Sequence, residues 1–279
     1  MKKIASLTML RHDDFFLRKW VAWYGSQLGM ENLYIFFDGQ DHTIPDYCEG
    51  THAEILPHRD QTVAKGDRSR ADFLSGKAAE LFTAGYDMVI GTDVDEFLIP
   101  DPRTGEGLRD FLSKYDDGRI SISGLGIDIG QDLRCEGPIE AQRPFLSQRH
   151  SAMISTRYSK TSVLCKSAAW GSGFHRVRHA NFRIVPDLFL FHFGSLDEGR
   201  ILAKFSDSER ISNGWEKHFG KRLRTIHAVS SMPAGDWEEA TARARHMQNI
   251  LRPVYAINKP AMLGLKVCVQ IPERFKELV

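Results

Sequence analysis

The sequence has no long hydrophobic run, no low-complexity tract and almost no net charge. Its 279 residues include 37 Lys and Arg against 36 Asp and Glu, which gives a formal charge of +1. A chain this close to neutral has no general electrostatic attraction for nucleic acid, so we expect no nucleic-acid partner. No stretch of about 18 consecutive apolar residues is present, so we expect no membrane-spanning helix. Repeat and coiled-coil architectures are excluded as well, because no fixed period appears.

Cysteines are few, and their spacing fits neither a metal site nor a disulfide framework. The four cysteines lie far apart, and no two have the Cys-X-X-Cys spacing of structural zinc sites. Scattered cysteines of this kind are typical of a reducing compartment. The apolar residues 4–10 are followed by no small-residue cleavage site, which favours a first buried strand over a signal peptide. We therefore expect a cytoplasmic protein.

Strand and helix patterns alternate through the first hundred residues. Short apolar runs predict strands, and apolar residues at helical spacing predict helices that end near Gly29 and Gly85. This alternation is typical of an α/β fold with a mostly parallel sheet. The predicted order is strand 3–10, helix 14–28, strands 33–37 and 52–56, helix 70–84 and strand 87–91.

The rest of the chain continues with strands and ends with helices. A strand is predicted at residues 119–128, further strands and loops follow, and the chain from Leu196 onward is helical in pattern. The clearest late helix begins at Asp236, where Glu239 completes a capping box. No linker rich in Gly, Ser or Pro separates the halves. We expect one domain, with an α/β part at 1–195 and a helical extension at 196–279.

The strongest chemical signal is a group of three carboxylates directly after the strand at 87–91. Asp93, Asp95 and Glu96 lie close together in sequence, where their mutual repulsion needs compensation. Mg²⁺ and Mn²⁺ prefer oxygen ligands, often one or two carboxylates together with phosphate oxygens. Ligands bind beyond the carboxyl ends of parallel strands, which is where this group lies. The alternative explanation is a solvated acidic turn.

Four segments together resemble the glycosyltransferase family 2-like group. They occur in the order and with the spacing found in that group, and they cover about the first hundred residues well. None of them would be specific alone. The segments are residues 9–13 (MLRHD), 20–24 (WVAWY), 34–39 (YIFFDG) and 93–98 (DVDEFL).

This resemblance implies a GT-A-like fold, a Rossmann-type mixed sheet flanked by helices that binds a nucleotide diphosphate sugar as donor. It implies that Asp93 and Asp95 hold a Mn²⁺ or Mg²⁺ ion at the donor diphosphate, with UDP as the default nucleotide. Such an ion offsets the charge that develops on the leaving group. Nucleotide contacts are then expected from Arg11 and Asp38, and a phosphate contact from Lys77.

Further ligand contacts are expected in three other places. His192 follows an apolar strand, and the resemblance makes it a candidate metal ligand, although a core histidine among aromatic residues is the alternative. Trp170 and His175 lie in a glycine-rich segment that either closes over a ligand or is an ordinary hairpin loop. Asp67 and Arg68 are candidates for donor or acceptor contacts, or else begin a solvated helix.

An inverting transfer, which the family implies, needs a carboxylate that accepts the proton of the acceptor hydroxyl. Asp128 ends the predicted strand that comes after the acidic motif. The resemblance implies that acceptor contacts occur at this position in a GT-A-like fold. Glu96 is the rival candidate because it adjoins the metal ligands. The sequence leaves both candidates open, and Asp128 as a simple turn residue is the third possibility.

The sequence thus predicts a metal-dependent glycosyltransferase that moves a hexose from a nucleotide-sugar donor to a hydroxyl of a glycan or lipid-linked acceptor. A nucleotidyltransferase that makes a nucleotide-sugar is one alternative, although residues 10–14 lack the glycines of its phosphate loop. A non-catalytic nucleotide-sugar-binding protein is the other. Basic and aromatic residues between 215 and 224 would allow peripheral contact with the inner face of a membrane, or they form a solvated helix face.

Overall fold

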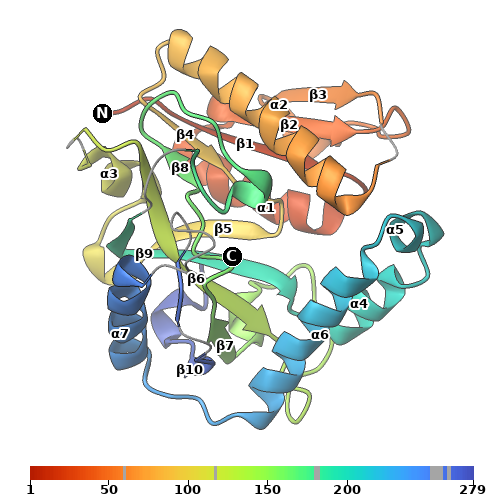
Figure 1. The fold of residues 1–279 in the computed structure, drawn as a ribbon, viewed down its shortest axis with the longest axis vertical. Coiled ribbons are helices and arrows are strands. Elements are labelled where there is room, and N and C mark those ends of the chain that lie inside the picture. The colour runs from red at the N-terminus through yellow and green to blue at the C-terminus, as the bar shows by residue number, and fades with distance from the viewer. Residues whose placement is uncertain (59–60, 116–117, 179–182, 252–259, 263–264) are drawn as a thin grey trace.

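The computed structural model describes residues 1–58, 61–115, 118–178, 183–251, 260–262 and 265–279 (Figure 1). The fold is a mixed α/β arrangement with a Rossmann-like sheet flanked by helices, as the sequence predicted. Ten strands and seven α-helices occur in these residues. None of the helices in the described ranges is long and apolar enough to cross a membrane.

The first four strands are parallel, and most later pairings are antiparallel. β1 (Ile4–Leu10) lies between β2 (Leu33–Asp38) and β4 (Met88–Gly91), and β3 (His52–Leu56) follows β2 at the edge. These strands match the predicted ones closely, because β1, β2 and β4 are short apolar runs and β3 is a weaker strand with apolar residues at Ala53, Ile55 and Leu56. The full order is β10-β7-β6-β8-β4-β1-β2-β3, and β9 pairs with β5 and β6. The later strands are β5 (Glu96–Pro100), β6 (Ser121–Gly130), β7 (Ser151–Ile154), β8 (Val163–Leu164), β9 (Ile184–Ser195) and β10 (Val267–Gln270).

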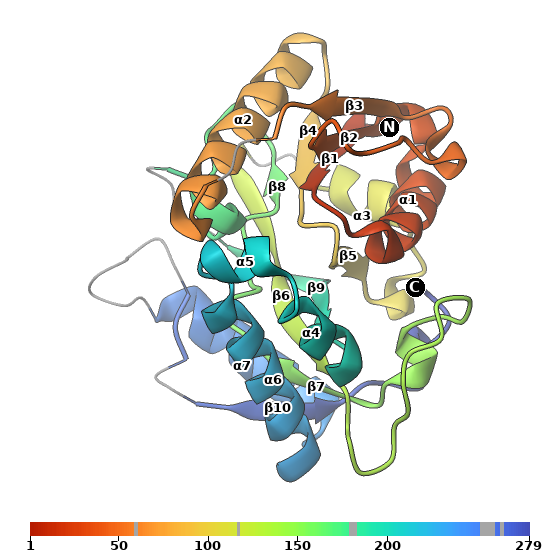
Figure 2. The ribbon, with the colours of Figure 1, turned by 90° about the vertical axis from the view of Figure 1, so that its right-hand side faces the viewer.

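Helices cover both faces of the parallel strands (Figure 2). Along β1, Ile4 and Leu10 join the core cluster that includes α1 (Asp14–Leu28), whereas Ala5 and Leu7 join the cluster that includes α2 (Val63–Thr83). Alternate residues of a strand point to opposite faces, so one apolar run supplies both cores. α2 begins seven residues before the predicted start at 70, because its first two turns are polar and show no apolar spacing.

Aromatic residues of α1 hold the segment that carries the acidic motif. Trp20 Nε1 donates a hydrogen bond to Thr92 Oγ1 at 3.0 Å, and Trp23 Nε1 donates to the Leu98 carbonyl at 3.2 Å. The Tyr24 hydroxyl accepts from the Leu98 amide at 2.9 Å. The helix therefore fixes both ends of the segment between β4 and β5.

The C-terminal part is helical but also returns to the sheet. Its helices are α4 (Glu198–Lys204), α5 (Ser208–Ser212), α6 (Glu216–Ser231) and α7 (Trp237–Ile250), while α3 (Leu108–Ser113) lies earlier, beside α1. Asp236 caps α7 as predicted, accepting from the Glu239 amide at 2.9 Å. The expectation of a purely helical extension is incomplete, because β10 pairs with β7 and Phe275 packs against Phe189.

A buried carboxylate ties the end of β5 to the C-terminal segment. Asp101 is fully buried and accepts hydrogen bonds from Arg274 Nε and Nη2, each at 2.8 Å, and from Arg103 Nη2 at 2.8 Å. Burial alone would raise the pKa of Asp101, but the hydrogen bonds from Arg274 and Arg103 lower it below its usual value. The ionised form is therefore the one that stabilises the fold.

Gly126 in β6 allows the chain to turn closely over the strand. Its amide donates to Ser159 Oγ at 2.9 Å, and its carbonyl accepts from the Ser155 amide at 2.9 Å. A Cβ atom at this position would overlap backbone atoms of Ser155, Tyr158 and Ser159. The same turn carries Tyr158 and Lys160 toward the carboxylates, so this glycine helps to position the site.

We expect Asp101→Asn to lower the free energy of unfolding at pH 7 by about 2 to 4 kcal/mol, because it leaves the arginines without a buried anion. The native pKa is lowered, so this stabilisation is complete above the ordinary carboxyl pKa of about 3.9 and is lost as the pH falls through the native value. Urea unfolding between pH 7 and pH 3 should show the difference from the unmodified protein shrinking. Glu49→Gln, an exposed carboxylate, is the control that should show no such change.

Gly126→Ala should destabilise the fold by about 1 to 3 kcal/mol, because the added methyl group has no space against the turn. Gly76→Ala is the matched control, since Gly76 lies in α2 with no atom within 4 Å of the new Cβ. Alanine there should stabilise the helix by about 0.5 to 1 kcal/mol. Equal unfolding midpoints in urea for the two variants would contradict the packing described here.

Candidate functional site

A cavity of about 580 Å³ lies beyond the carboxyl ends of β1 and β2. The N-terminal half of α2, the turn at 157–160, and helices α4 and α6 complete its walls. Basic residues outnumber acidic ones in the described lining. The lining includes the basic residues Arg11, Arg70, Arg157, Lys160, Lys204, Arg210, Lys221 and Arg222, and the acidic residues Asp13, Asp38, Asp67, Asp93, Asp95 and Asp207.

The three carboxylates of the acidic motif are each compensated by cations from distant segments. Lys160 Nζ lies 2.8 Å from Asp93 Oδ2 and 2.5 Å from Glu96 Oε1. Arg70 Nη1 lies 2.9 Å from Asp93 Oδ1, and Arg222 Nη2 lies 2.9 Å from Asp95 Oδ2. Burial of charge is costly unless it is paired in this way.

A buried histidine links two of the carboxylates of the site. His192 Nδ1 lies 2.7 Å from Asp128 Oδ1, and His192 Nε2 lies 3.4 Å from Asp95 Oδ2. Tyr158 stacks on the imidazole with ring centroids 3.6 Å apart, and Thr225 Oγ1 donates to Asp128 Oδ2 at 2.8 Å. Asp128 is thereby held on both of its oxygen atoms.

The charges of these neighbours change the protonation of the cluster. Burial alone would raise the pKa of Asp93, but the charges of Arg70 and Lys160 lower it to about 2. Burial would lower the pKa of His192, yet Asp95 and Asp128 raise it to about 9. At neutral pH this histidine is therefore a cation between two carboxylates.

Several residues singled out in the sequence lie in the cavity wall. Arg11 and Asp38 meet at the ends of β1 and β2, where Arg11 Nη1 donates to the Asp38 carbonyl at 2.8 Å. Both nitrogens of His192 face carboxylates, so binding a metal would require that it lose a proton. The other expected site residues that line the cavity are Asp67, Asp93, Asp95 and His175.

Five of the expected site residues are not part of the cavity wall. Trp170 was expected to stack on a sugar, but its side chain is fully buried and its Nε1 donates to the Thr161 carbonyl at 2.8 Å. Lys77 pairs with Glu80 at 3.2 Å on α2 rather than reaching toward a phosphate. Also outside the lining are Arg68, which is exposed, and the two candidate bases Glu96 and Asp128, which are buried in the ion pairs described above.

The sequence did not identify the main partners of the carboxylates. Lys160 was not singled out. Arg70 lies in the helix start that was expected either to contact a ligand or to be solvated. Arg222 lies between residues 215 and 224, for which membrane contact and a solvated helix face were both left open. Three carboxylates within four residues at the end of a buried strand do signal that cations must be near. Nothing local in the sequence says which of its 37 Lys and Arg residues supply them.

Comparison with known proteins identifies solved structures only. No family model matches the chain, and no curated protein does. One similar structure is named as mannose-1-phosphate geranyltransferase of Thermus thermophilus, with 12% identity over 86% of this chain and 68% of that chain and a TM-score of 0.33. Another is named as a putative glucose-1-phosphate thymidylyltransferase of Bacillus anthracis, with 8% identity over 84% and 98% of the chains and a TM-score of 0.30. A third is a cytidylyltransferase of Leptospira borgpetersenii, with 13% identity over 44% and 54% and a TM-score of 0.27.

These comparisons correct the main functional prediction. The thymidylyltransferase and the cytidylyltransferase carry the names of nucleotidyltransferases, and none of the three structures is named as a family 2 glycosyltransferase. The prediction of a glycosyltransferase is contradicted by these names. With identities of 13% or less and TM-scores of 0.33 or less, the likeness says nothing further about activity, which must be argued from the cavity itself.

Lys160→Ala should lower the free energy of unfolding by about 3 kcal/mol, because it leaves Asp93 and Glu96 buried without their shared cation. For the same reason the variant should gain more thermal stability from Mg²⁺ than the unmodified protein does, since the ion can replace the lost charge. Melting temperatures with and without Mg²⁺ measure both effects.

Lys77→Ala is the matched control for that variant, because the ion pair of Lys77 with Glu80 on α2 is exposed to solvent. Such a pair contributes less than about 1 kcal/mol. If the two lysine variants melt at the same temperature, Lys160 does not carry the compensation assigned to it.

Proposed function

We propose that this protein is a nucleotidyltransferase that joins a nucleotide to a sugar phosphate. The observation that carries the proposal is the excess of cations in the cavity, two of which have no carboxylate partner. Arg157 and Lys221 line the cavity and form no ion pair with the described part of the chain. Their unbalanced charge favours a ligand that carries phosphate groups.

Arg157 and Lys221 form a distinct positive region on the turn at 157–160 and on α6. Burial lowers the pKa of Lys221, and the neighbouring charges of Arg157, Arg224 and Lys217 lower it further. A phosphate placed between these groups would relieve that repulsion. The other cations of the cavity, such as Arg70 and Arg222, are instead held on carboxylates. Arg157 and Lys221 therefore offer uncompensated positive charge to the phosphate of one of the two substrates.

The proposed reaction needs no side chain to remove a proton from a hydroxyl. An oxygen of the sugar phosphate, which is already deprotonated, attacks the α-phosphorus of a nucleoside triphosphate. The bond from the α-phosphorus to the bridging oxygen breaks, and pyrophosphate leaves with the electron pair. This agrees with the positions of Glu96 and Asp128, the two candidate bases, which are held by Lys160 and His192 outside the cavity wall.

The residues present also fit a divalent cation that accompanies a triphosphate. Asp93, Asp95 and Glu96 each offer one carboxylate oxygen, and these three oxygens lie within 4.8 Å of one another. Asp93 and Asp95 also line the cavity. Asp93 and Asp95 would hold Mg²⁺ or Mn²⁺ there, and such an ion supplies positive charge to the leaving pyrophosphate. Lys160 and Arg70 would then be released from Asp93 and could contact phosphate oxygens.

The test is a pyrophosphate-release assay with each of the four nucleoside triphosphates, a set of hexose 1-phosphates and Mg²⁺. We expect release that depends on both substrates. Arg157→Ala and Lys221→Ala should each raise the KM for one of the two substrates by about tenfold. This change corresponds to the loss of about 1.4 kcal/mol of binding free energy. Arg243→Ala, an exposed arginine on α7, should leave both KM values unchanged.

Two outcomes would overturn the proposal. Nucleotide binding in a thermal-shift titration without any pyrophosphate release would favour the non-catalytic alternative. Release of a nucleoside diphosphate from a nucleotide-sugar, with transfer of the sugar to an acceptor, would show that a different bond is broken.

A further inference from the structure

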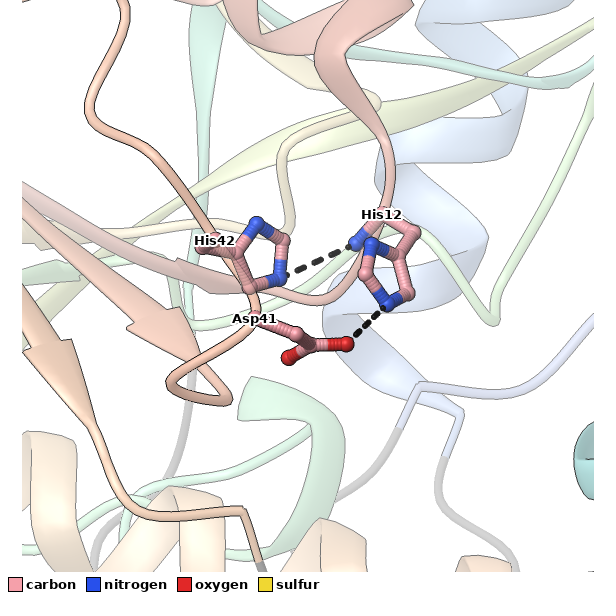
Figure 3. Close-up of side chains that lie close together, drawn as sticks. All are labelled: His12, Asp41 and His42. Atoms are coloured by element: carbon pink, nitrogen blue, oxygen red, sulfur yellow. Dashed lines mark hydrogen bonds and ion pairs between the residues drawn. The ribbon is translucent and has the colours of Figure 1, made fainter.

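Two histidines and an aspartate form a second cluster (Figure 3), of which His12 also lines the cavity. His12 follows β1, and Asp41 and His42 follow β2; the parallel register that pairs Leu10 with Phe37 brings these two loops together. His12 Nε2 lies 3.0 Å from Asp41 Oδ2, and the His12 amide donates to His42 Nε2 at 3.4 Å. One ligand atom from each residue lies within 4.8 Å of the others.

We propose that His12, Asp41 and His42 bind a transition-metal ion of the zinc class. Two imidazole nitrogens and one carboxylate oxygen make a three-residue donor set that zinc accepts, with water completing the coordination. Nitrogen donors distinguish this cluster from the all-oxygen group of the acidic motif, which suits Mg²⁺ or Mn²⁺. This second cluster therefore selects a different ion from the one expected at the centre of the cavity.

Neighbouring groups hold the carboxylate of this cluster in place. Arg11 Nη1 donates to Asp41 Oδ1 at 3.0 Å and to the Asp38 carbonyl at 2.8 Å, so it ties both loops together. A Cβ atom at Gly39 would overlap both Arg11 Nη1 and Asp41 Oδ1. Gly39 also has φ of +130°, a conformation that other residues rarely adopt. The turn thus has the one residue that leaves room for this arrangement.

The histidine rings must rotate before they can share an ion, and His12 is exposed while His42 is half-buried. They stack with centroids 4.5 Å apart and 24° between their planes. A bound metal lies in the plane of each imidazole, so the rings must turn away from this stacked position. His12 and Asp41 have side chains that are about half exposed, which leaves them free to turn. The charge of Arg11 opposes a cation, so we expect weaker binding than at a buried structural zinc site.

The experiment is a calorimetric titration of the whole chain with Zn²⁺ in the presence of excess Mg²⁺, which occupies the oxygen ligands of the acidic motif. We expect one equivalent of Zn²⁺ to bind. His12→Ala and His42→Ala should each weaken that binding by at least about tenfold, and the double variant should abolish it. His227→Ala, an exposed histidine on α6, is the matched control and should bind Zn²⁺ as the unmodified protein does.

Co²⁺ gives a second readout, because its visible absorption should show nitrogen and oxygen coordination that disappears in the double variant. Melting temperatures measured without metal should be nearly unchanged in both single variants, since both histidines lie in loops and His12 is half exposed. Undiminished Zn²⁺ binding in the double variant, which would place the ion at another group such as the exposed Cys135, overturns the proposal. So does the absence of Zn²⁺ binding by the unmodified protein.

Discussion

The structure depends on compensating negative charge that is buried at the end of the sheet. Asp95, Glu96 and Asp128 are almost completely buried, and an isolated carboxylate in such a place would cost several kcal/mol. The compensating groups come from different parts of the fold: Lys160 from a turn over β6, and His192 from β9. The packing of these elements therefore also brings the compensating charges to the carboxylates.

Local patterns predicted much of the fold and little of the charge compensation. β1, β2 and β4 were predicted because each is an apolar run, and the start of α7 because Asp236 and Glu239 form a capping box. β10 was missed because its four residues gain their stability from pairing with β7, far away in sequence. The partners of Asp93 and Asp95 were missed for the same reason. An ion pair between distant segments produces no periodic pattern in the sequence from which it could be predicted.

Trp170 shows how a correct local pattern can suggest the wrong role. Trp170 is followed by Gly171, Gly173, His175 and Arg176, a composition that is typical of a mobile loop. In the fold its ring lies against Gly91 of β4, where any side chain would overlap the indole. Ser75 Oγ on α2 accepts a hydrogen bond from the Trp170 amide at 3.0 Å. The space left by Gly91, rather than the composition of the loop, therefore allows Trp170 to pack in the core.

The resemblance to family 2 glycosyltransferases also has a structural explanation. Residues 20–24 of the shared pattern include the three aromatic residues of α1 that hydrogen-bond to the Thr92 hydroxyl and to the backbone of Leu98. These contacts shape an acidic site at the end of a parallel sheet, and such a site can serve different reactions. The chemistry depends on the groups that surround it, which the resemblance does not cover.

The spacing of the ion pairs along the chain has a consequence for biosynthesis. Asp95 and Arg222 are 127 residues apart, and Asp93 and Lys160 are 67 apart. As the chain leaves the ribosome, the acidic segment emerges well before any of these later counter-charges. The first four strands and α1 can begin to associate early, but the segment at 93–96 must stay hydrated until the second half of the chain is made. Closure of the acidic end of the sheet is therefore a late step of folding.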